Sequence, residues 1–195
     1  MWTPRPNPEN EQERSDEELL PALTRGDEAA FLTIYRRRQS ALFRYALHLC
    51  GDGEVAAEAV QETFLALLRA AGKLNGTQGT VVAWLFAVAR NQVMKQLQNR
   101  YRHEPLEEEE AGVLAAAGCV AAEFEQMERN GRVREALATL PAAYREVLVL
   151  CDMEELPYET VAAIAGCPVG TVRSRLHRGR ALLAAKLKLV VGYTL

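Results

Sequence analysis

Residues 158–188 read YETVAAIAGCPVGTVRSRLHRGRALLAAKLK: a short apolar segment, a glycine-containing turn and a longer basic segment. Both segments are predicted helices, and Gly166-Cys167-Pro168 between them supplies residues that end one helix before the next begins. A short helix, a tight turn with glycine and a longer helix form the pattern of a helix-turn-helix. Many αα-hairpins share this pattern, so on its own it indicates DNA binding only weakly.

Charge segregation in the longer segment strengthens the DNA-binding interpretation. The stretch from Pro168 to Lys188 holds six basic residues and no acidic one, namely Arg173, Arg175, Arg178, Arg180, Lys186 and Lys188. A solvated basic face is the alternative for such a helix. The preceding turn and the complete absence of acid favour a nucleic-acid partner.

A helical period sorts the side chains of this segment onto two faces. The apolar positions predicted to turn inward are Val169, Val172, Leu176 and Leu183. A recognition helix presents base-reading side chains on the outward face of its N-terminal half, and the residues there are Arg173, Ser174, His177 and Arg178. Arg175 and Arg180 are better placed for phosphates, which position a protein without reading sequence.

Upstream, residues 15–102 are predicted to form a bundle of four helices. The segment Ser15-Asp16-Glu17-Glu18 has the capping-box pattern, and Gly26-Asp27 and Gly51-Asp52-Gly53 supply stops and new caps. Apolar residues at three- and four-residue spacing follow. In the third helix the residues predicted to face inward are Ala56, Val60, Phe64, Leu67 and Leu68. No run has the alternation of a strand, so the chain is predicted to be all-α.

The fourth helix of that bundle carries a second basic stretch. Residues 81–102 contain Arg90, Lys95, Arg100 and Arg102 and no acidic residue. Trp84 and a glycine-bearing loop at residues 75–80 lie at its start. Aromatic and polar groups beside a basic helix suit single-stranded nucleic acid, where stacking and backbone attraction act together. A place in the bundle core is the alternative for Trp84.

Two further segments flank or separate these helical parts. Residues 1–14 contain three prolines and little apolar surface, so we expect a disordered tail. Residues 103–128 carry eight glutamates and neither Lys nor Arg, which predicts a flexible acidic linker. The predicted organisation is therefore two small helical domains, at 15–102 and 129–190, joined by that linker.

Composition indicates an ordinary cytoplasmic protein. The chain has 195 residues, 49% of them apolar, and a net charge of −3. No apolar run approaches the roughly 20 residues that span a bilayer, and the N-terminus lacks the apolar core of a signal peptide. The four cysteines are far apart and form no C-x-x-C pair, so reduced thiols are expected. The near-neutral net charge hides opposite charges sorted by segment.

No constellation for catalysis or metal binding stands out in the sequence. The histidines His48, His103 and His177 share no metal-ligand spacing with each other or with the cysteines. Phosphate-loop, dinucleotide and nucleophile-elbow motifs are absent. We therefore expect no enzyme activity, metal or cofactor.

Two motifs resemble those of the extracytoplasmic-function (ECF) RNA polymerase sigma factors. The segments AEAVQETF at 57–64 and WLFAVARN at 84–91 are similar to region 2 of this family. The segments LPAAYREVL at 140–148 and GCPVGTVRSRLHR at 166–178 resemble region 4. Together these regions cover nearly the whole chain except the tail and the acidic linker.

The resemblance implies a bacterial transcription initiation factor that binds core RNA polymerase and directs it to promoters. Region 2 would dock on the clamp coiled coil of the β′ subunit through Glu58, Gln61, Glu62 and Phe64. Region 2 would also recognise and melt the minus-ten element through Asn75, Gln78, Trp84, Arg90 and Asn91. Region 4 would bind the flap of the β subunit and read the minus-thirty-five element with the outward residues of its basic helix. The acidic linker would thread toward the active-site and RNA-exit channels.

The resemblance further implies an anti-sigma partner, which in this family is often membrane-bound, and a monomer when the chain is free. The rival interpretation is a stand-alone helix-turn-helix regulator whose N-terminal bundle dimerises or senses a ligand. Such a regulator would form a stable homodimer and bind a palindromic duplex without polymerase.

Overall fold

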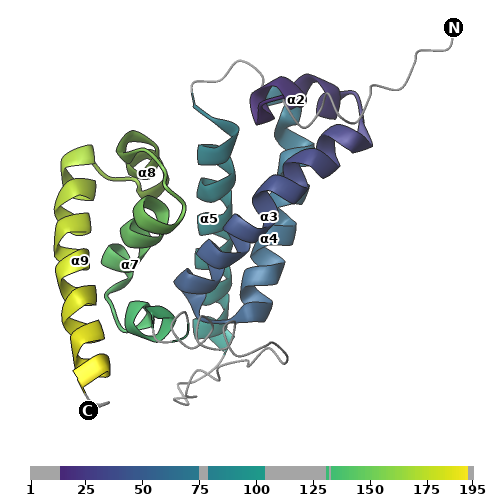
Figure 1. Cartoon of the computed structure of the whole chain (residues 1–195). Coiled ribbons are helices and arrows are strands. Elements are labelled where there is room, and N and C mark those ends of the chain that lie inside the picture. Colours follow the sequence, from purple (N-terminus) through teal and green to yellow (C-terminus); the bar gives the residue numbers. More distant parts are fainter. Residues whose placement is uncertain (1–13, 75–78, 104–130, 132, 193–195) are drawn as a thin grey trace, which may run out of the picture.

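The structure, a computed structural model, describes residues 14–74, 79–103, 131 and 133–192 (Figure 1). The N-terminal part contains α2 (Asp16–Thr24), α3 (Glu28–Cys50), α4 (Gly53–Leu74) and α5 (Val81–His103). After helical residues 133–138, the C-terminal part contains α7 (Ala142–Leu148), the π-helix η1 (Val149–Met153), α8 (Tyr158–Ala165) and α9 (Val169–Gly192). No strand occurs within these ranges, so the all-α prediction is confirmed.

Side-chain caps begin the first helices where the sequence predicts them. The Ser15 hydroxyl accepts a 3.2 Å hydrogen bond from the Glu18 N–H, and the Glu18 carboxylate accepts a 2.7 Å bond from the Ser15 N–H. Asp27 accepts backbone N–H bonds at the start of α3, and Asp52 does so at the start of α4. Gly51 ends α3 with a φ of 73°, a left-handed conformation that glycine adopts without strain.

The helices α3, α4 and α5 pack side by side, and α2 lies across one end of them (Figure 1). Fully buried side chains in this core include Leu42, Tyr45, Leu67 and Leu85. The prediction for Leu68 is wrong, because this side chain is 48% exposed. It lies at the rim of a groove between α3 and α4 instead of in the bundle core.

The C-terminal part contains the predicted helix-turn-helix. Gly166 ends α8 with a φ of 62°, its N–H donates to the Ala162 carbonyl, and α9 begins at Val169. The helix α7 packs along α9, and Gly179 permits their close approach. A Cβ at Gly179 would lie only 3.1 Å from Cδ1 of Leu148, a side chain that is itself buried.

The two helical parts lie against each other. The helix α7 contacts α3, and α8 contacts α5 (Figure 1). The buried apolar residues of both parts form one continuous cluster. Apart from Arg14 and His103, the predicted tail (1–14) and linker (103–128) lie outside the described residues. The domain division at 15–102 and 129–190 therefore stays a prediction.

Candidate nucleic-acid and polymerase interfaces

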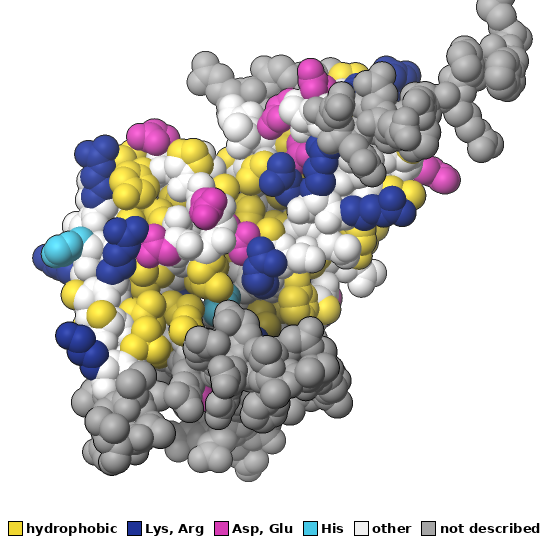
Figure 2. Space-filling view, viewed as in Figure 1, with side chains coloured by type: hydrophobic (Ala, Val, Ile, Leu, Met, Phe, Trp, Pro, Cys, Tyr) yellow, Lys and Arg dark blue, Asp and Glu magenta, His cyan; other side chains and the backbone are white. Residues whose placement is uncertain are grey.

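The outward face of α9 has the side chains that the sequence predicts there. Arg173, Ser174, His177 and Arg178 are all exposed. Val172 and Leu176, one helical turn apart, are buried against the rest of the C-terminal part. Figure 2 shows Lys and Arg side chains spaced along the exposed edge of α9. The four outward residues thus lie together on a free face of the second helix of the helix-turn-helix.

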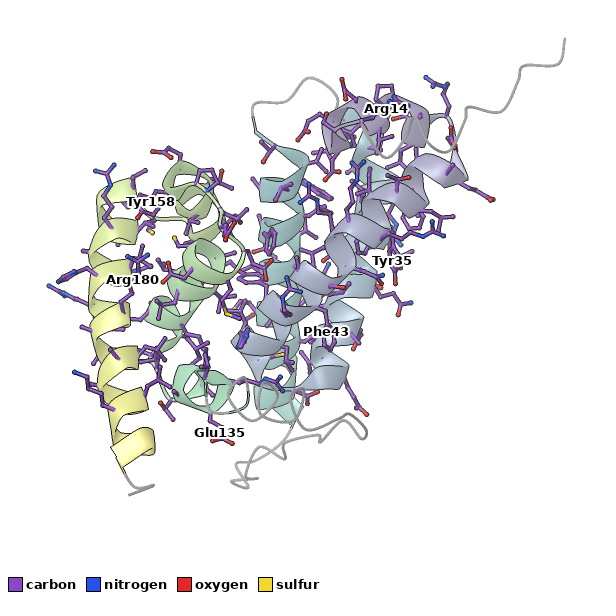
Figure 3. All side chains as sticks on the ribbon, in the orientation of Figure 1. Arg14, Tyr35, Phe43, Glu135, Tyr158 and Arg180 are labelled. Carbon is purple, nitrogen blue, oxygen red and sulfur yellow. The ribbon has the colours of Figure 1, made fainter. Side chains whose placement is uncertain are left out.

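Local contacts orient two of these four residues. The guanidinium of Arg173 lies 5.9 Å from the centre of the Tyr158 ring, within cation–π range. The Ser174 hydroxyl donates a 3.0 Å hydrogen bond to the Thr171 carbonyl. Tyr158 is the first residue of α8, next to the beginning of α9 (Figure 3). The first residue of α8 and the first turn of α9 thus orient two of the side chains predicted to face DNA.

The two arginines predicted for phosphates are engaged within the C-terminal part. Arg180 donates to Asp152 from Nε at 2.9 Å and from Nη2 at 2.6 Å. These hydrogen bonds are the main reason that the pKa of Arg180 is raised. Arg175 is half-buried, and its Nη1 lies 3.7 Å from Sγ of Cys167. Arg180 is still 57% exposed, so it can reach a phosphate while Asp152 orients it.

Of the residues predicted for the minus-ten element, the three that the structure describes all lie on α5 but differ in exposure. Trp84 is half-buried and packs against the core, as the core alternative for this residue requires. Asn91 is exposed on α5, and Arg90 is half-buried and paired with Glu146. Asn75 and Gln78 lie outside the described residues.

Glu146 of α7 forms a buried polar cluster with two residues of the N-terminal part. Its Oε1 accepts a 2.6 Å hydrogen bond from Nε of Arg90 and a 3.0 Å bond from the hydroxyl of Tyr45. Glu146 is 4% exposed, and Tyr45 is fully buried. Burial, and then the adjacent carboxylate, raise the pKa of Tyr45 well above its ordinary value. Tyr45 therefore stays a neutral donor.

Further polar contacts join the two parts at the edge of this cluster. Arg44 donates to both oxygens of Glu154, with Nε–Oε1 and Nη2–Oε2 distances of 3.1 Å. Arg145 donates from Nη2 to the Leu49 carbonyl at 3.3 Å, near the C-terminal end of α3. Cationic side chains at the C-terminus of a helix also interact favourably with its dipole.

A groove of about 610 Å³ runs between α3 and α4. Its floor is aromatic: the ring centres of Tyr35 and Phe64 are 4.7 Å apart, and Phe31 packs edge-on to Phe64 at 6.2 Å. Exposed Phe43 and Leu68 lie at its rim. Figure 3 shows Tyr35 and Phe43 along α3, on the opposite side of the molecule from α9.

The residues predicted to dock on core polymerase differ in their exposure and in whether they line this groove. Gln61 is exposed and lines the groove, and Glu58, one turn earlier on α4, is exposed as well. Glu62 is half-buried. Phe64 is 3% exposed, as its inward position in the helical period predicts, and its ring forms part of the groove floor. A partner in the groove would therefore contact Phe64 from above.

The cysteines in the described part of the chain are partly buried. Cys50, Cys151 and Cys167 are half-buried and form no disulfide among the described residues. Burial raises the pKa of Cys151 to about 11, so this thiol is protonated at neutral pH. Among the described residues, no group of three or more His, Cys, Asp or Glu is placed to hold a metal ion.

Sequence reasoning missed the polar cluster around Glu146. Arg90 is identified from the sequence, but as a DNA contact rather than the partner of a carboxylate. One signal is available: Glu146 precedes the apolar run Val147-Leu148-Val149-Leu150, at a position one turn from the buried Val149 and Leu150. A lone acid at an inward position of a helix needs a buried cationic partner.

Two known families match separate parts of the chain. Residues 34–103 match the family described as Sigma-70 region 2. Residues 130–183 match the family described as Sigma-70, region 4. The first match covers most of α3 with α4 and α5, and the second includes the helix-turn-helix.

Individual proteins are similar over most of the chain. The ECF RNA polymerase sigma factor SigM of Mycobacterium tuberculosis is 34% identical over 177 residues, which are 90% of this chain and 86% of that protein. SigE of Mycolicibacterium smegmatis, also an ECF RNA polymerase sigma factor, is 33% identical over 160 residues, 80% of this chain but 62% of that longer protein. The structure of the sigma factor RpoE in complex with the anti-sigma factor NepR from Bartonella quintana is 26% identical, has a TM-score of 0.60 and covers 87% of this chain and 92% of RpoE.

Proposed function

This chain belongs to the ECF RNA polymerase sigma factors, a class of non-enzymatic initiation factors, and we propose that it directs bacterial core RNA polymerase to specific promoters. The observation that carries the proposal is the second helix of the helix-turn-helix. Its outward face presents Arg173, Ser174, His177 and Arg178 together. A region 2 bundle precedes that motif in the same chain.

We propose that α9 reads the minus-thirty-five element in the major groove. Arginine can donate two hydrogen bonds to guanine, and serine and histidine can bond base edges or phosphates. Arg173 is braced by Tyr158, and this contact limits the freedom that the side chain would lose on binding. Arg175 and Arg180 would contact phosphates at the side of the same groove.

We propose that the minus-ten element is recognised by the last helix of region 2 together with the loop before it. Arg90 and Asn91 on α5 would contact the strand, together with Asn75 and Gln78. Trp84 supports this surface from the core side, since it is half-buried. The basic character of residues 81–102 supports this assignment, because proteins that bind single strands follow the phosphate backbone with a positively charged surface.

Core polymerase would dock on α4 and the α3–α4 groove. The aromatic floor and exposed Phe43 and Leu68 offer the apolar area that a stable interface needs. Glu58 lies one turn before Gln61 on α4, Glu62 follows Gln61 directly, and these three residues would contact the β′ clamp coiled coil. Region 4 would contact the β flap, and residues 103–128 would thread toward the active-site channel.

An anti-sigma factor is the remaining proposed partner. RpoE, a similar sigma factor, has been solved with the anti-sigma factor NepR. We propose that this chain is cytoplasmic and is a monomer when free. We also propose that an anti-sigma factor, either soluble or membrane-bound, holds it inactive. None of the described helices is long and apolar enough to cross a bilayer.

Run-off transcription with purified core RNA polymerase tests the proposal. The expected result is a transcript that depends on both this chain and a cognate promoter, with the chain monomeric in solution. The rival, a stand-alone helix-turn-helix regulator, predicts a homodimer that binds a palindromic duplex without polymerase. Failure to obtain a promoter-dependent transcript from any candidate promoter would overturn the sigma-factor assignment.

A further inference from the structure

We infer that the free chain closes on itself through the contact of Glu146 with Arg90 and Tyr45, and that this closed form is incompetent for promoter recognition. The inference rests on the proposed function. The three residues, called the Glu146 latch below, join region 4 to two helices of region 2: Glu146 is on α7, Tyr45 on α3 and Arg90 on α5.

The latch satisfies its polar groups only while the two regions are together. One oxygen of Glu146 accepts both the 2.6 Å bond from Arg90 and the 3.0 Å bond from Tyr45. Both donors come from region 2, and the carboxylate is almost completely removed from water. A buried carboxylate is tolerated when it is paired with a cation and hydrogen-bonded. Loss of the cation or of the hydrogen bonds makes its burial strongly unfavourable. The latch thus favours one relative position of the regions over near alternatives.

Contacts around the latch reinforce that position. The bidentate pair of Arg44 with Glu154 joins α3 to the segment after η1, and Arg145 bonds the Leu49 carbonyl. The apolar residues of both regions form one continuous cluster. Two helices of region 2 therefore hold region 4 by polar and apolar contacts at once.

The closed form cannot span a promoter. The names of the minus-ten and minus-thirty-five elements give their positions on the promoter, which are roughly 25 base pairs apart. At 3.4 Å per base pair this separation is about 85 Å. In the closed form Arg90, assigned to the minus-ten element, touches Glu146 of region 4. The whole of α9 is only about 36 Å long at 1.5 Å per residue. The two regions must separate before both elements can be occupied.

The latch also occupies a group that promoter DNA would use. The Nε of Arg90 donates to a carboxylate, which is an anionic acceptor like a phosphate. Glu146 therefore takes the place of the nucleic-acid backbone at Arg90. Closure lowers the apparent affinity for core enzyme and promoter in proportion to the open fraction.

A covalent lock tests this directly in the full chain. The variant carries Arg44→Cys and Glu154→Cys, with the four native cysteines replaced by serine, and a short bismaleimide joins the two new thiols. The matched control is the same protein with each thiol blocked separately by N-ethylmaleimide. We expect efficient intramolecular joining and at least tenfold less run-off transcript from the joined protein than from the blocked one.

The outcomes separate the latch from the sigma-factor function. Equal transcript from joined and blocked protein would overturn the inhibitory role, and failure of the free chain to join internally would overturn the closed form. Loss of transcript from the blocked and the native proteins alike would overturn the proposed function, and the inhibitory role with it.

A second variant releases the latch without any cross-link. Glu146→Lys places a cation against Arg90 in the closed form but leaves it in water when the regions separate. We expect its apparent affinity for core polymerase to rise at least fivefold, while Glu135→Lys, the same change at an exposed site, leaves the affinity unchanged. Circular dichroism reports whether the helices remain folded. A folded Glu146→Lys protein with unchanged or weaker core affinity would contradict the latch.

Discussion

Tyr45 and Glu146 are 101 positions apart in the chain, and the hydroxyl of the first donates a 3.0 Å hydrogen bond to the carboxylate of the second inside the protein. The Tyr45 ring also packs edge-on against Phe86, with ring centres 5.2 Å apart. One side chain thus belongs to the core of region 2 and to the contact with region 4. Stability and interdomain closure are therefore coupled at this position.

Tyr45→Phe separates these two roles. The ring and its packing remain, but Glu146 loses one of its two donors inside the protein. Loss of a hydrogen bond to a buried charged group should lower the free energy of unfolding by about 1.5–3 kcal/mol. Urea denaturation measures the change, and Tyr35→Phe at a half-buried position should change it by much less. Equal effects of the two variants would contradict the coupling.

Arg178→Ala should relax specificity at one base pair of the minus-thirty-five element. A bidentate arginine–guanine contact contributes about 1–3 kcal/mol of discrimination. Holoenzyme binding to a set of single-base promoter variants measures it. Lys188→Ala, at an exposed position near the other end of α9, should leave discrimination intact. Uniform weakening over all promoters by Arg178→Ala would show that Arg178 contacts only phosphate.

Charge reversal on α4 should weaken binding to core polymerase. Glu58→Lys combined with Gln61→Ala changes the exposed face beside the α3–α4 groove and leaves its buried floor untouched. We expect at least a tenfold rise in the dissociation constant for core enzyme with an unchanged thermal midpoint. Glu54→Lys, an equal charge change near the start of the same helix, is the control. Unchanged core affinity of the double variant would refute the docking surface.

Two glycines of α9 should respond oppositely to alanine. Gly179→Ala places a methyl group about 3.1 Å from Cδ1 of the buried Leu148, so crowding should outweigh the gain in helix propensity and destabilise the protein by about 1–2 kcal/mol. Gly170 has no neighbouring atom within 4 Å, and Gly170→Ala should stabilise by up to about 1 kcal/mol. Thermal unfolding compares them. A stabilising Gly179→Ala would mean that α7 does not pack closely on α9.

His48 should make the protein less stable in mild acid. Burial, followed by repulsion from Arg134, Arg145 and Arg44, lowers its pKa from 6.5 to about 4. Because the folded protein resists protonation of His48, the stability it provides is present above pH 6.5 and is lost as the pH falls toward 4.

The predicted loss from this source is about 2 kcal/mol between pH 7 and pH 4, allowing for screening of a half-buried side chain. The pKa of Glu154 is raised by burial, so this group opposes the trend, and the difference between variants is the proper readout. Urea unfolding of His48→Gln should show a flatter pH dependence than the unmodified chain. The exposed His177→Gln should not; an equal flattening in both would exclude His48 as the source.

Local sequence rules predict the helices well because their signals lie within a few residues. The capping residues Ser15, Asp27 and Asp52 act on backbone groups two or three positions away. The helical period likewise places the exposed and buried faces of α9. Phe64 is buried as the helical period predicts, whereas Leu68, predicted inward by the same period, is 48% exposed because it lies at the rim of the groove between α3 and α4. Periodicity identifies a face of a helix but not what covers it.

Contacts between distant segments are beyond such rules. Glu146 reads as part of an ordinary amphipathic helix, and nothing within α7 indicates that its partners are 56 and 101 positions away. Arg180 likewise reads as a free basic residue until Asp152 is found next to it. The basic residues are predicted correctly as charges, but their acidic partners depend on tertiary packing.

The five residues of η1 limit which insertions and deletions this part of the chain tolerates. A π-helix holds one more residue in its turn than an α-helix does. Asp152 at this turn pairs with Arg180 on α9, and Glu154 just after it pairs with Arg44 on α3. Deletion of one residue within Val149–Met153 would rotate the rest of this turn by about 100° and misdirect both carboxylates together. Substitutions at this turn can accumulate singly, whereas insertions and deletions there must be compensated in two helices at once.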